Sequence, residues 1–540
     1  MKRLNLTLPL VFFVLLSYGQ SPSDKTDSLL QQALPEKEHA VAVLVAKGND
    51  IIYQKALGYA DREAKLEANL KTTFRIGSVT KQFTAVAILK LVEMGKMKLD
   101  DPLSKYILDF PRGEEVTIHH LLTHVSGIRS YTDQPEFLHR VTVPVDQGVL
   151  IEEIKSLGYE FSPGEQWKYN NSAYYILGYL VEKVSGMSYE KFLTRHFFQP
   201  AGMTNTGVYH NDKKPKNEAK GYSLDSADLE LALDWDMTWA GGAGNMYSTV
   251  SDLHRWNQKL FAGALIQKDL LEKAHTKVKL NDGSEYPYGY GWGVGEYKGL
   301  RRIAHGGGLH GFLSSLIYYP ELDATIVVLS NASPPGNIVP TSFAENLTKI
   351  YFEEHLEKDE EVEVDYALYD KYTGKYEYPG GVIMTVSRDG AHLYGQLTGQ
   401  ARYEIFPKGD HRFFWKVVDA QVTFHLNEQG EVDYAAHSQG GFEAKAPRIA
   451  DQQEVALEEG AFERYSGEYN MNGTNVKIWE EENRYYIQLE GQPRFEIFPK
   501  SDNRFFLKDL VAEIEFGSEE PKATSFTLYQ GGREIKARRQ

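Results

Sequence analysis

The sequence predicts an α+β fold followed by two small all-β barrel domains. Strand-like runs lie at both ends of residues 24–356, with helical patterns between them, so one sheet must be assembled from distant segments. Residues 366–449 and 461–540 instead alternate apolar and polar residues, and they resemble each other. At 540 residues the chain is also too long for a single hydrophobic core.

Residues 1–19 are expected to be a signal peptide outside the fold. Lys2 and Arg3 precede an apolar run of about 14 residues, shorter than the roughly 20 that a membrane-spanning helix needs. The small residues Ser17 and Gly19 precede a suitable cleavage point. We therefore expect a periplasmic or secreted protein with no stable membrane insertion after cleavage. An uncleaved membrane anchor is the alternative.

Composition excludes several classes of function. The net charge is −16 and no long basic run occurs, so we expect no nucleic acid partner. The chain has no cysteine, which excludes disulfides, a thiol nucleophile and a cysteine-ligated zinc site. The sequence carries no signal for oligomeric state.

The first domain begins and ends with recognisable elements. "VAVLVAKGNDIIYQKALGYAD" predicts a hairpin that turns at Gly48 and Asn49. "VTKQFTAVAILKLVEMG" predicts a helix that stops at Gly95. Near residue 320, "FLSSLIYYP" and "ATIVVLSNAS" predict two strands, and "PTSFAENLTKIYFEEHL" predicts a closing helix.

The C-terminal part contains an internal repeat. "YDKYTGKYEY" and "YEIFPKGDHRFFWK" match the later "FERYSGEYNM" and "FEIFPKSDNRFFLK" at nearly equal offsets, which indicates a duplication. Each copy predicts an antiparallel sheet curled into a small barrel, with aromatic residues such as Phe413, Trp415 and Phe505 in its core. A platform that binds sugars is the alternative for these aromatic residues. The charged runs 357–365 and 450–460 are interpreted as solvated linkers.

Ser78 and Lys81 are the candidate nucleophile and base. Residues three apart lie on one helical face, so Lys81 can reach the Ser78 hydroxyl. A serine needs a base to take its proton, and a lysine acts as that base only when burial or another cation lowers its pKa. The apolar helix offers such burial. The pattern alone is weak, because Ser188 and Lys191 match it too, and Ser188 is expected to cap a helix.

Two further elements carry candidate site residues. Tyr169 and Asn171 form a Tyr-x-Asn pattern just ahead of another apolar helix, although Tyr209 and Asn211 also match it. The stretch His305-Gly306-Gly307-Gly308 leaves a strand-like "RRIA", and its glycines allow a backbone to approach a ligand closely. A glycine-rich turn that needs only flexibility is the alternative.

These three elements, in this order, resemble the penicillin-recognising serine hydrolases, which include class C β-lactamases, serine D,D-peptidases, related esterases and D-aminopeptidases. "TIHHLLTHVSGI", "DDPLSKYI", "AGGAGNMYSTVSDLHRW" and "YGYGWG" are similar to the same family. The resemblance covers roughly residues 28–355. It implies an antiparallel sheet flanked by helices, with a helical region inserted and the site at their junction.

The resemblance also implies roles for the site residues. Ser78 would be acylated, Lys81 would be its base partner, Tyr169 would shuttle protons and Asn171 would orient substrate. The amides of Ser78 and Gly308 would form the oxyanion hole beside Gly307. His305 stands where many members have a lysine, and an unperturbed imidazole is mostly neutral at pH 7, so we expect weak β-lactam turnover. No metal or organic cofactor is expected, and His120 and His124 are read as structural.

The predicted function is an exported serine hydrolase that cleaves ester, amide or peptide bonds of a small-molecule or peptide substrate. A true β-lactamase or D,D-carboxypeptidase is one alternative. A non-catalytic ligand-binding or sensory protein on the same fold is another. Four aromatic residues are interpreted as lining a pocket or as plain packing: Tyr131, Trp235, Trp239 and Tyr247.

Overall fold

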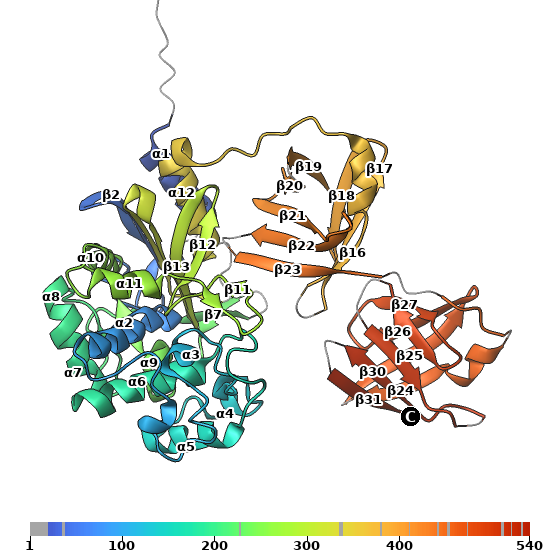
Figure 1. Ribbon diagram of the computed structural model, residues 1–540, viewed down its shortest axis with the longest axis horizontal. Helices are drawn as coiled ribbons and strands as arrows, with labels where there is room; N and C mark the ends of the chain where they lie inside the picture. The colour runs from blue at the N-terminus through green and yellow to red at the C-terminus, as the bar shows by residue number, and fades with distance from the viewer. Residues whose placement is uncertain are drawn as a thin grey trace, which may run out of the picture. The chain divides into compact units, whose positions relative to one another are not determined.

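The computed structural model describes residues 20–34, 38–225, 228–333, 339–378, 381–409, 411–439, 442–450, 454–458, 460–471, 473–508, 512–519, 521–530 and 533–540. The predicted signal peptide lies outside these residues. The chain divides into two units, one that ends at Leu356 and one that starts at Glu357 (Figure 1).

The first unit is organised around a six-stranded antiparallel sheet of order β12-β13-β14-β15-β1-β2. The N-terminal hairpin pairs with β15 along the whole of β1, so segments from the two ends of the unit share one sheet. This confirms the expected hairpin and the sheet built from distant segments. In sheet order the strands are β12 (Gly293–Tyr297), β13 (Leu300–Leu309), β14 (Phe312–Tyr319), β15 (Ala324–Ser330), β1 (Val41–Lys47) and β2 (Asp50–Leu57).

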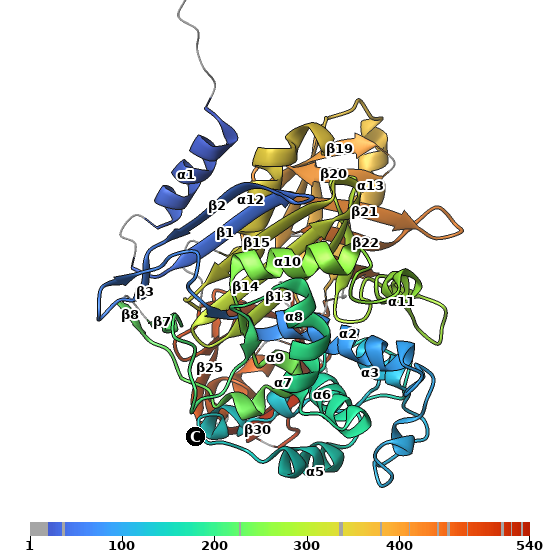
Figure 2. The same cartoon turned by 90° about the vertical axis from the view of Figure 1, so that its left-hand side faces the viewer.

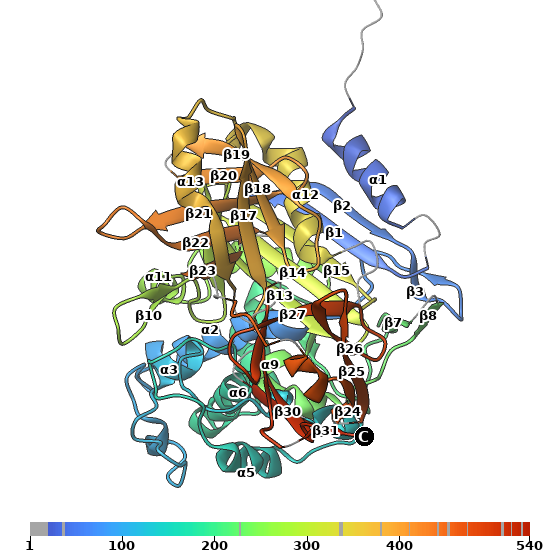
Figure 3. The same cartoon turned by 90° about the vertical axis from the view of Figure 1, so that its right-hand side faces the viewer.

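Both faces of this sheet are covered by helices, which explains why β1 is apolar at nearly every position. Val41, Val43 and Val45 belong to the core cluster that includes residues of α1 (Pro22–Ala33) and α12 (Pro340–Phe352). The alternate β1 residues belong to a second cluster, with α2 (Thr80–Glu93) and α10 (Val250–Phe261). Figure 2 shows α10 in front of the sheet, and Figure 3 shows α1 beside β1 and β2.

α2 is the central helix of the unit, because its residues from Thr80 to Leu89 are all buried. It begins after the short 3₁₀ helix η1 (Gly77–Val79) and ends two residues before Gly95, as the sequence predicts. α6 (Asn171–Ser185) packs against α9 (Gly241–Gly244) with almost no space between the backbones: a Cβ added at Gly178 would lie 2.9 Å from the Gly242 Cα. This close approach brings α9 beside α2.

The remaining elements of the first unit are short. Its helices are η2 (Leu103–Lys105), α3 (Ile118–Leu122), η3 (Tyr131–Asp133), α4 (Phe137–Arg140), α5 (Gln147–Leu157), α7 (Tyr189–Leu193), η4 (Thr194–Phe198), α8 (Gln199–Ala201), η5 (Met237–Trp239), α11 (Lys268–Ala274), η6 (Pro320–Leu322) and η7 (Glu353–His355). Its strands are β3 (Tyr59–Asp61), β4 (Leu66–Glu67), β5 (Phe74–Arg75), β6 (Gly207–Val208), β7 (Tyr222–Asp225), β8 (Asp228–Leu231), β9 (Met246–Ser248), β10 (Val278–Lys279) and β11 (Glu285–Tyr286). β5 pairs with β9 and leads directly into η1.

The second unit contains two closed barrels of eight antiparallel strands. The first comprises β16 (Gly374–Glu377), β17 (Ile383–Asp389), β18 (His392–Leu397), β19 (Tyr403–Gly409), β20 (Arg412–Trp415), β21 (Ala420–Leu426), β22 (Val432–Gln439) and β23 (Phe442–Ile449), preceded by η8 (Tyr366–Leu368) and α13 (Tyr369–Tyr372). The second comprises η9 (Ala461–Arg464) and then β24 (Gly467–Met471), β25 (Thr474–Glu481), β26 (Arg484–Leu489), β27 (Arg494–Pro499), β28 (Arg504–Leu507), β29 (Ala512–Phe516), β30 (Ser525–Gln530) and β31 (Arg533–Arg539).

Equivalent contacts recur in the two barrels. The Tyr376 hydroxyl donates to the Tyr372 carbonyl at 2.7 Å, and the Tyr469 hydroxyl donates to the Tyr465 carbonyl at 2.8 Å. The predicted core aromatics are buried, among them Phe413, Trp415 and Phe505. The duplication read from the sequence is therefore a duplication of a folded unit.

Most of residues 357–365 are exposed, as their interpretation as a solvated linker predicts, but the segment also contacts the first barrel. Lys408 is buried and lies 3.0 Å from Asp359 and 3.5 Å from Glu357. The Val362 amide donates to the Pro407 carbonyl at 3.0 Å. The acidic run therefore packs along β19, because a buried lysine there needs carboxylates to compensate its charge.

Within the described residues, no helix combines the length and the apolar character that crossing a membrane requires.

Candidate active site

Ser78 lies half-buried at the junction of the sheet and the helical region. It sits in η1, directly ahead of the buried helix α2. Gly77 has a φ of +49°, and a Cβ added there would lie 2.9 Å from the Gly308 nitrogen. A glycine is required at this position because the turn is left-handed and because β13 passes at contact distance.

Lys81 is fully buried and makes three contacts through Nζ. Nζ lies 3.1 Å from the Ser78 Oγ, 2.8 Å from the Asn171 Oδ1 and 2.8 Å from the Ala243 carbonyl oxygen. These partners come from η1, α6 and α9, so the packing of α6 on α9 is what surrounds the amine. Burial lowers the pKa of Lys81 well below its usual value, which favours the neutral amine.

Tyr169 covers the same amine from another side. The Lys81 Nζ lies 4.8 Å from the centre of the Tyr169 ring. Burial raises the pKa of Tyr169, and a hydrogen bond with Ser78 acts in the opposite, weaker direction. The phenol therefore stays protonated at neutral pH, next to both Ser78 and Lys81.

Asn171 is held at the first position of α6. The neighbouring Asn170 caps the helix by accepting a hydrogen bond from the Ala173 amide at 2.8 Å. The Asn171 side chain donates through Nδ2 to the Thr132 Oγ1 at 3.0 Å while its oxygen faces Lys81. Its orientation is therefore defined at both ends of the amide.

The glycine run after His305 continues strand β13, which agrees with its interpretation as a strand edge open to close backbone approach, and the alternative of a flexible glycine-rich turn is wrong. Gly306, Gly307 and Gly308 pair in register with β14. A Cβ added at Gly307 would lie only 2.0 Å from the Ile76 carbonyl oxygen. Absence of a side chain, and not flexibility, is what this strand needs at Gly307, because β13 passes directly against the segment that carries Ser78.

His305 uses both ring nitrogens within the protein. Its Nε2 lies 3.0 Å from the Tyr288 hydroxyl, and its Nδ1 faces the Gly306 carbonyl. A carbonyl only accepts, so the proton resides on Nδ1 and the Tyr288 hydroxyl donates to Nε2. Burial, with a smaller contribution from nearby Lys81, lowers the pKa of His305 to about 3, so the imidazole is neutral at neutral pH.

The structure thus brings all seven sequence-predicted site residues to one place, and it adds four that sequence reasoning missed. Thr132 bonds Asn171, Ala243 bonds Lys81 and Tyr288 bonds His305. The fourth, Tyr174, has its ring centre 5.6 Å from the Lys81 Nζ. Tyr288 belongs to "YGYGWG", which the resemblance includes, but nothing in that pattern reveals a contact with His305. Ala243 contributes its carbonyl, which no side-chain pattern can reveal.

His120 and His124 have separate structural roles. The His120 Nδ1 accepts a hydrogen bond from the Thr117 amide at the start of α3. The His124 Nδ1 accepts from the Asn170 amide at 3.1 Å, and its ring lies 4.5 Å from that of Tyr169. The Nδ1 atoms of the two histidines therefore accept hydrogen bonds from different backbone amides.

The competing sequence matches lie elsewhere. Ser188 caps α7 by accepting a hydrogen bond from the Lys191 amide at 3.3 Å, as expected. Asn211 bonds the backbone of Trp235 and Met237.

A pocket of about 260 Å³ opens beside Ser78. Tyr131 and Trp235 line it, as one interpretation of these aromatics predicts. Trp239 does not line it, because its indole is buried and donates to the Val143 carbonyl at 2.6 Å. Tyr247 is likewise not among the lining residues, which are Gly77, Ser78, Tyr131, Thr132, Phe137, Leu138, Asn171, Trp235, Ala240, Ala243, Gly244, Gly308 and Leu309.

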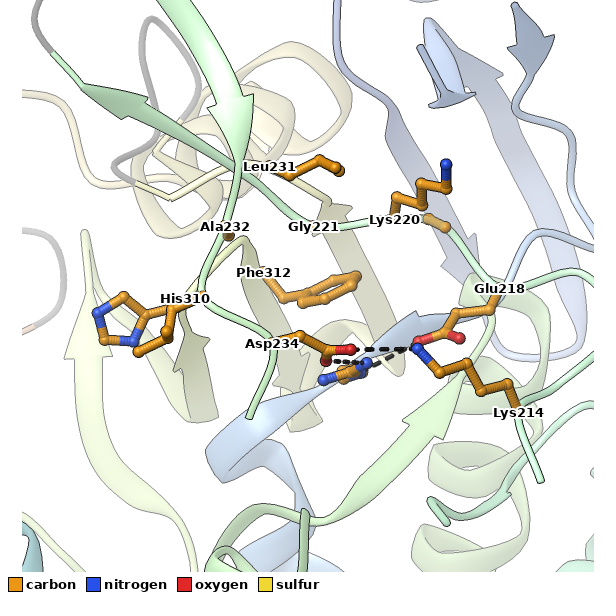
Figure 4. A pocket seen from close by; sticks show the side chains of 12 residues that line it. Lys214, Glu218, Lys220, Gly221, Leu231, Ala232, Asp234, His310 and Phe312 are labelled. Atoms are coloured by element: carbon orange, nitrogen blue, oxygen red, sulfur yellow. Dashed lines mark hydrogen bonds and ion pairs between the residues drawn. The ribbon is translucent and has the colours of Figure 1, made fainter. Parts of the chain in front are cut away.

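A second pocket, of about 230 Å³, contains charged groups (Figure 4). At its base the buried Arg75 guanidinium lies 3.1 Å from Glu218 and 2.7 Å from Asp234. Lys214 lies 3.1 Å from the same Asp234. The two pockets lie on either side of a hydrogen bond in which the Trp235 Nε1 donates to the His310 Nδ1 at 2.9 Å.

Comparison with known families places two matches on the chain. Residues 27–345 match the family described as Beta-lactamase. Residues 358–444 match a domain of unknown function (DUF3471).

Individual proteins match over long stretches. The chain is 31% identical to penicillin-binding protein 4* of Bacillus subtilis (strain 168) over 74% of this chain and 93% of that protein. The octameric penicillin-binding protein homologue from Pyrococcus abyssi superposes with a TM-score of 0.55 and 25% identity, over 86% of this chain and 98% of that one. The D-stereospecific amidohydrolase from Streptomyces sp. superposes with a TM-score of 0.53 and 26% identity, over 61% of this chain and 98% of that one.

Proposed function

The chain belongs to the Beta-lactamase family, which it matches over residues 27–345, and on that premise we propose that it is a serine hydrolase that cleaves ester, amide or peptide bonds through an acyl-serine intermediate. Ser78 is the nucleophile and Lys81 is its base. The observation that carries this proposal is the set of three contacts around the Lys81 nitrogen.

The partners of Lys81 define where its lone pair points. A neutral amine has two N–H donors and one lone pair. The Asn171 oxygen and the Ala243 carbonyl can only accept, so they take the two N–H groups. The lone pair is left facing the Ser78 hydroxyl 3.1 Å away, which is within the reach expected of a general base and its nucleophile. Lys81 therefore accepts the Ser78 proton as Oγ attacks the scissile carbonyl.

Tyr169 completes the proton path. Its raised pKa keeps the phenol protonated, so it can pass a proton to the leaving group and recover one from Lys81. The developing oxyanion is stabilised by the amides of Ser78 and Gly308, which the glycine-lined approach of β13 to Gly77 holds on one side of the site. Asn171 and Thr132, which are hydrogen-bonded to each other and line the same pocket, orient the substrate.

His305 argues against recognition of a carboxylate. Both ring nitrogens are engaged and the ring is neutral, so it offers no cation where many relatives carry lysine. We therefore favour esterase, amidase or peptidase activity over β-lactamase or D,D-carboxypeptidase activity. β-Lactamase or D,D-carboxypeptidase activity remains the second candidate function, because the name of the relative penicillin-binding protein 4* refers to penicillin binding. A kcat/KM for nitrocefin near 10⁷ M⁻¹s⁻¹, in the upper range of enzyme efficiencies, would refute this preference.

The direct test is intact mass after exposure to a fluorophosphonate probe and, separately, to a penicillin. We expect a single adduct on the wild-type protein, none on Ser78→Ala and the wild-type result on Ser188→Ala, which removes the competing Ser-x-x-Lys serine. No adduct on folded wild-type protein would favour the non-catalytic ligand-binding alternative. In that case ligand binding would be indifferent to Ser78→Ala.

We also propose that the chain is exported and acts in the periplasm or outside the cell. The support is the charged, apolar and then small-residue pattern of residues 1–19. The N-terminal sequence of the mature protein tests it: a chain that retains Lys2 and Arg3 was not cleaved.

A further inference from the structure

The pocket beside Ser78 has no side chain among its lining residues that is charged at neutral pH. Within the described part of the chain, its lining contains no Asp, Glu, Lys, Arg or His. Lys81 and His305, the two bases of the site, are not among the lining residues, and burial lowers the pKa of each so that the neutral form is favoured. A charged substrate group that entered this pocket would lose water and find no side chain of opposite charge among the lining residues, which is unfavourable.

The pocket wall is aromatic and apolar. The Phe137 ring makes edge-to-face contacts with two other rings. Its centroid lies 5.6 Å from that of Tyr131 and 5.1 Å from that of Trp235. Leu138 and Leu309 complete the wall. The volume of about 260 Å³ falls just below the roughly 300–1,000 Å³ of sites for drug-sized ligands, so it suits one ring on a short chain.

Charge is instead concentrated on the far side of the Trp235–His310 hydrogen bond. There, Arg75, Lys214, Glu218 and Asp234 form a network of ion pairs (Figure 4). The groups that could recognise an ionised substrate end thus line this second pocket and not the pocket beside Ser78.

Resting on the proposed acyl-serine chemistry, we infer that the group next to the scissile carbonyl is an uncharged aromatic or bulky apolar group. Substrates with a carboxylate or an ammonium at that position are rejected. This assigns a substrate class to the pocket and separates the protein from hydrolases that recognise a terminal carboxylate or a free amine.

The test uses three methyl esters, which share methanol as the leaving group: methyl 3-phenylpropanoate, monomethyl glutarate and methyl 4-trimethylammoniobutyrate. Their acyl chains end in a phenyl ring, a carboxylate and a cation. We expect kcat/KM for the phenylpropanoate ester to exceed kcat/KM for each charged ester by at least about tenfold. Burial of the ring favours the first substrate, and the uncompensated charge disfavours the other two. Their potency in slowing fluorophosphonate labelling of Ser78 is expected to follow the same order, and this second readout needs binding only.

Leu138 offers a charge swap. It lies in α4, lines the pocket and is 49% exposed, so a polar replacement is tolerated by the fold. Leu138→Lys is expected to raise kcat/KM for the glutarate ester about tenfold relative to kcat/KM for the phenylpropanoate ester. Leu138→Glu is expected to raise kcat/KM for the cationic ester by the same relative amount. Leu108→Lys is the matched control, because Leu108 is 88% exposed and lies outside the pocket lining.

Failure of the inference and failure of the proposed function give different results. If Ser78 acquires the adduct but a charged ester matches the phenyl ester in both readouts, the inference is wrong and the hydrolase proposal stands. It is also wrong if the Leu138 variants change the ratios no more than Leu108→Lys does. If Ser78 acquires no adduct, the proposed function fails, and the inference fails with it.

Discussion

Gly307→Ala tests whether the approach of β13 to the nucleophile turn creates the oxyanion hole. The added Cβ would lie 2.0 Å from the Ile76 oxygen and 2.4 Å from the Ser314 Oγ. Ordinary carbon–oxygen contacts begin near 3.4 Å, so the strand and the turn must separate by roughly 1 Å or more. The hydrogen bond from the Ser314 hydroxyl to the Ile76 carbonyl, now 2.8 Å long, would be disturbed by the same movement.

The expected loss follows from that displacement. Misplacing a catalytic group by about 1 Å costs on the order of 100-fold, and removing one oxyanion donor costs about 10²–10³-fold in kcat. We therefore expect kcat for methyl 3-phenylpropanoate to fall by about 100-fold or more, with a smaller effect on KM. Crowding of the core also lowers the free energy of unfolding by about 1–3 kcal/mol, so kcat is measured at a temperature where the variant remains folded.

Gly306→Ala is the matched control one residue earlier. A Cβ there would meet nothing nearer than the Ser314 carbonyl oxygen at 3.6 Å, which is ordinary contact. We expect kcat and the melting temperature of Gly306→Ala to stay close to the wild-type values. Equal activity of the two alanine variants, both folded, would refute the argument that the Gly307 contact sets the oxyanion hole.

Three further outcomes are expected. In the pH profile of kcat/KM for a neutral ester, activity is lost as pH falls through the pKa of Lys81, because the ammonium cannot accept the Ser78 proton; burial places that limb well below pH 10.5. Asn171→Asp puts a carboxylate at the position 2.8 Å from Nζ and should move the limb upward by about 1–3 pH units, and an unchanged limb would show that Lys81 is not the group observed. Arg75→Ala leaves Glu218, whose side chain is 12% exposed, without its buried partner, while the half-exposed Asp234 keeps Lys214; we expect a loss of about 3 kcal/mol in urea unfolding, at the lower end of the range for a broken buried pair. Arg112→Ala, from an exposed pair with Glu115, should cost much less, and similar losses would contradict the reading of the Arg75 network. Finally, burial lowers the pKa of both His275 and His305 to about 3, so the unfolded chain binds more protons than the folded one between pH 6.5 and 3, and stability must decrease as pH falls through that window. His275→Gln should flatten this decrease in thermal unfolding, and a slope identical to wild type would exclude His275 as a contributor.

Much of the fold could be read from the sequence because the signals are local. The turn at Gly48 and Asn49, the stop of α2 near Gly95 and the cap at Ser188 depend on residues a few positions apart. The barrels were likewise visible, because alternation and duplication are properties of the chain itself. The sequence left the glycine run after His305 open between a strand edge and a flexible turn, since a glycine that avoids a clash and a glycine that permits a turn look the same in a sequence.

The candidate site shows the same division. The spacing of Ser78 and Lys81 on one helical face, and the order of the three elements, are contained in the sequence and sufficed to propose the nucleophile and its base. Only the tertiary structure decided that Lys81 also faces Asn171 and the Ala243 carbonyl. It likewise decided that the Tyr288 hydroxyl is hydrogen-bonded to His305 and that Gly307 is the glycine without room for a side chain. It also decided that the pocket beside Ser78 is uncharged while its neighbour is not. The physical reason is that ionisation and steric fit depend on burial and on atoms brought together from distant segments, and no local pattern records either.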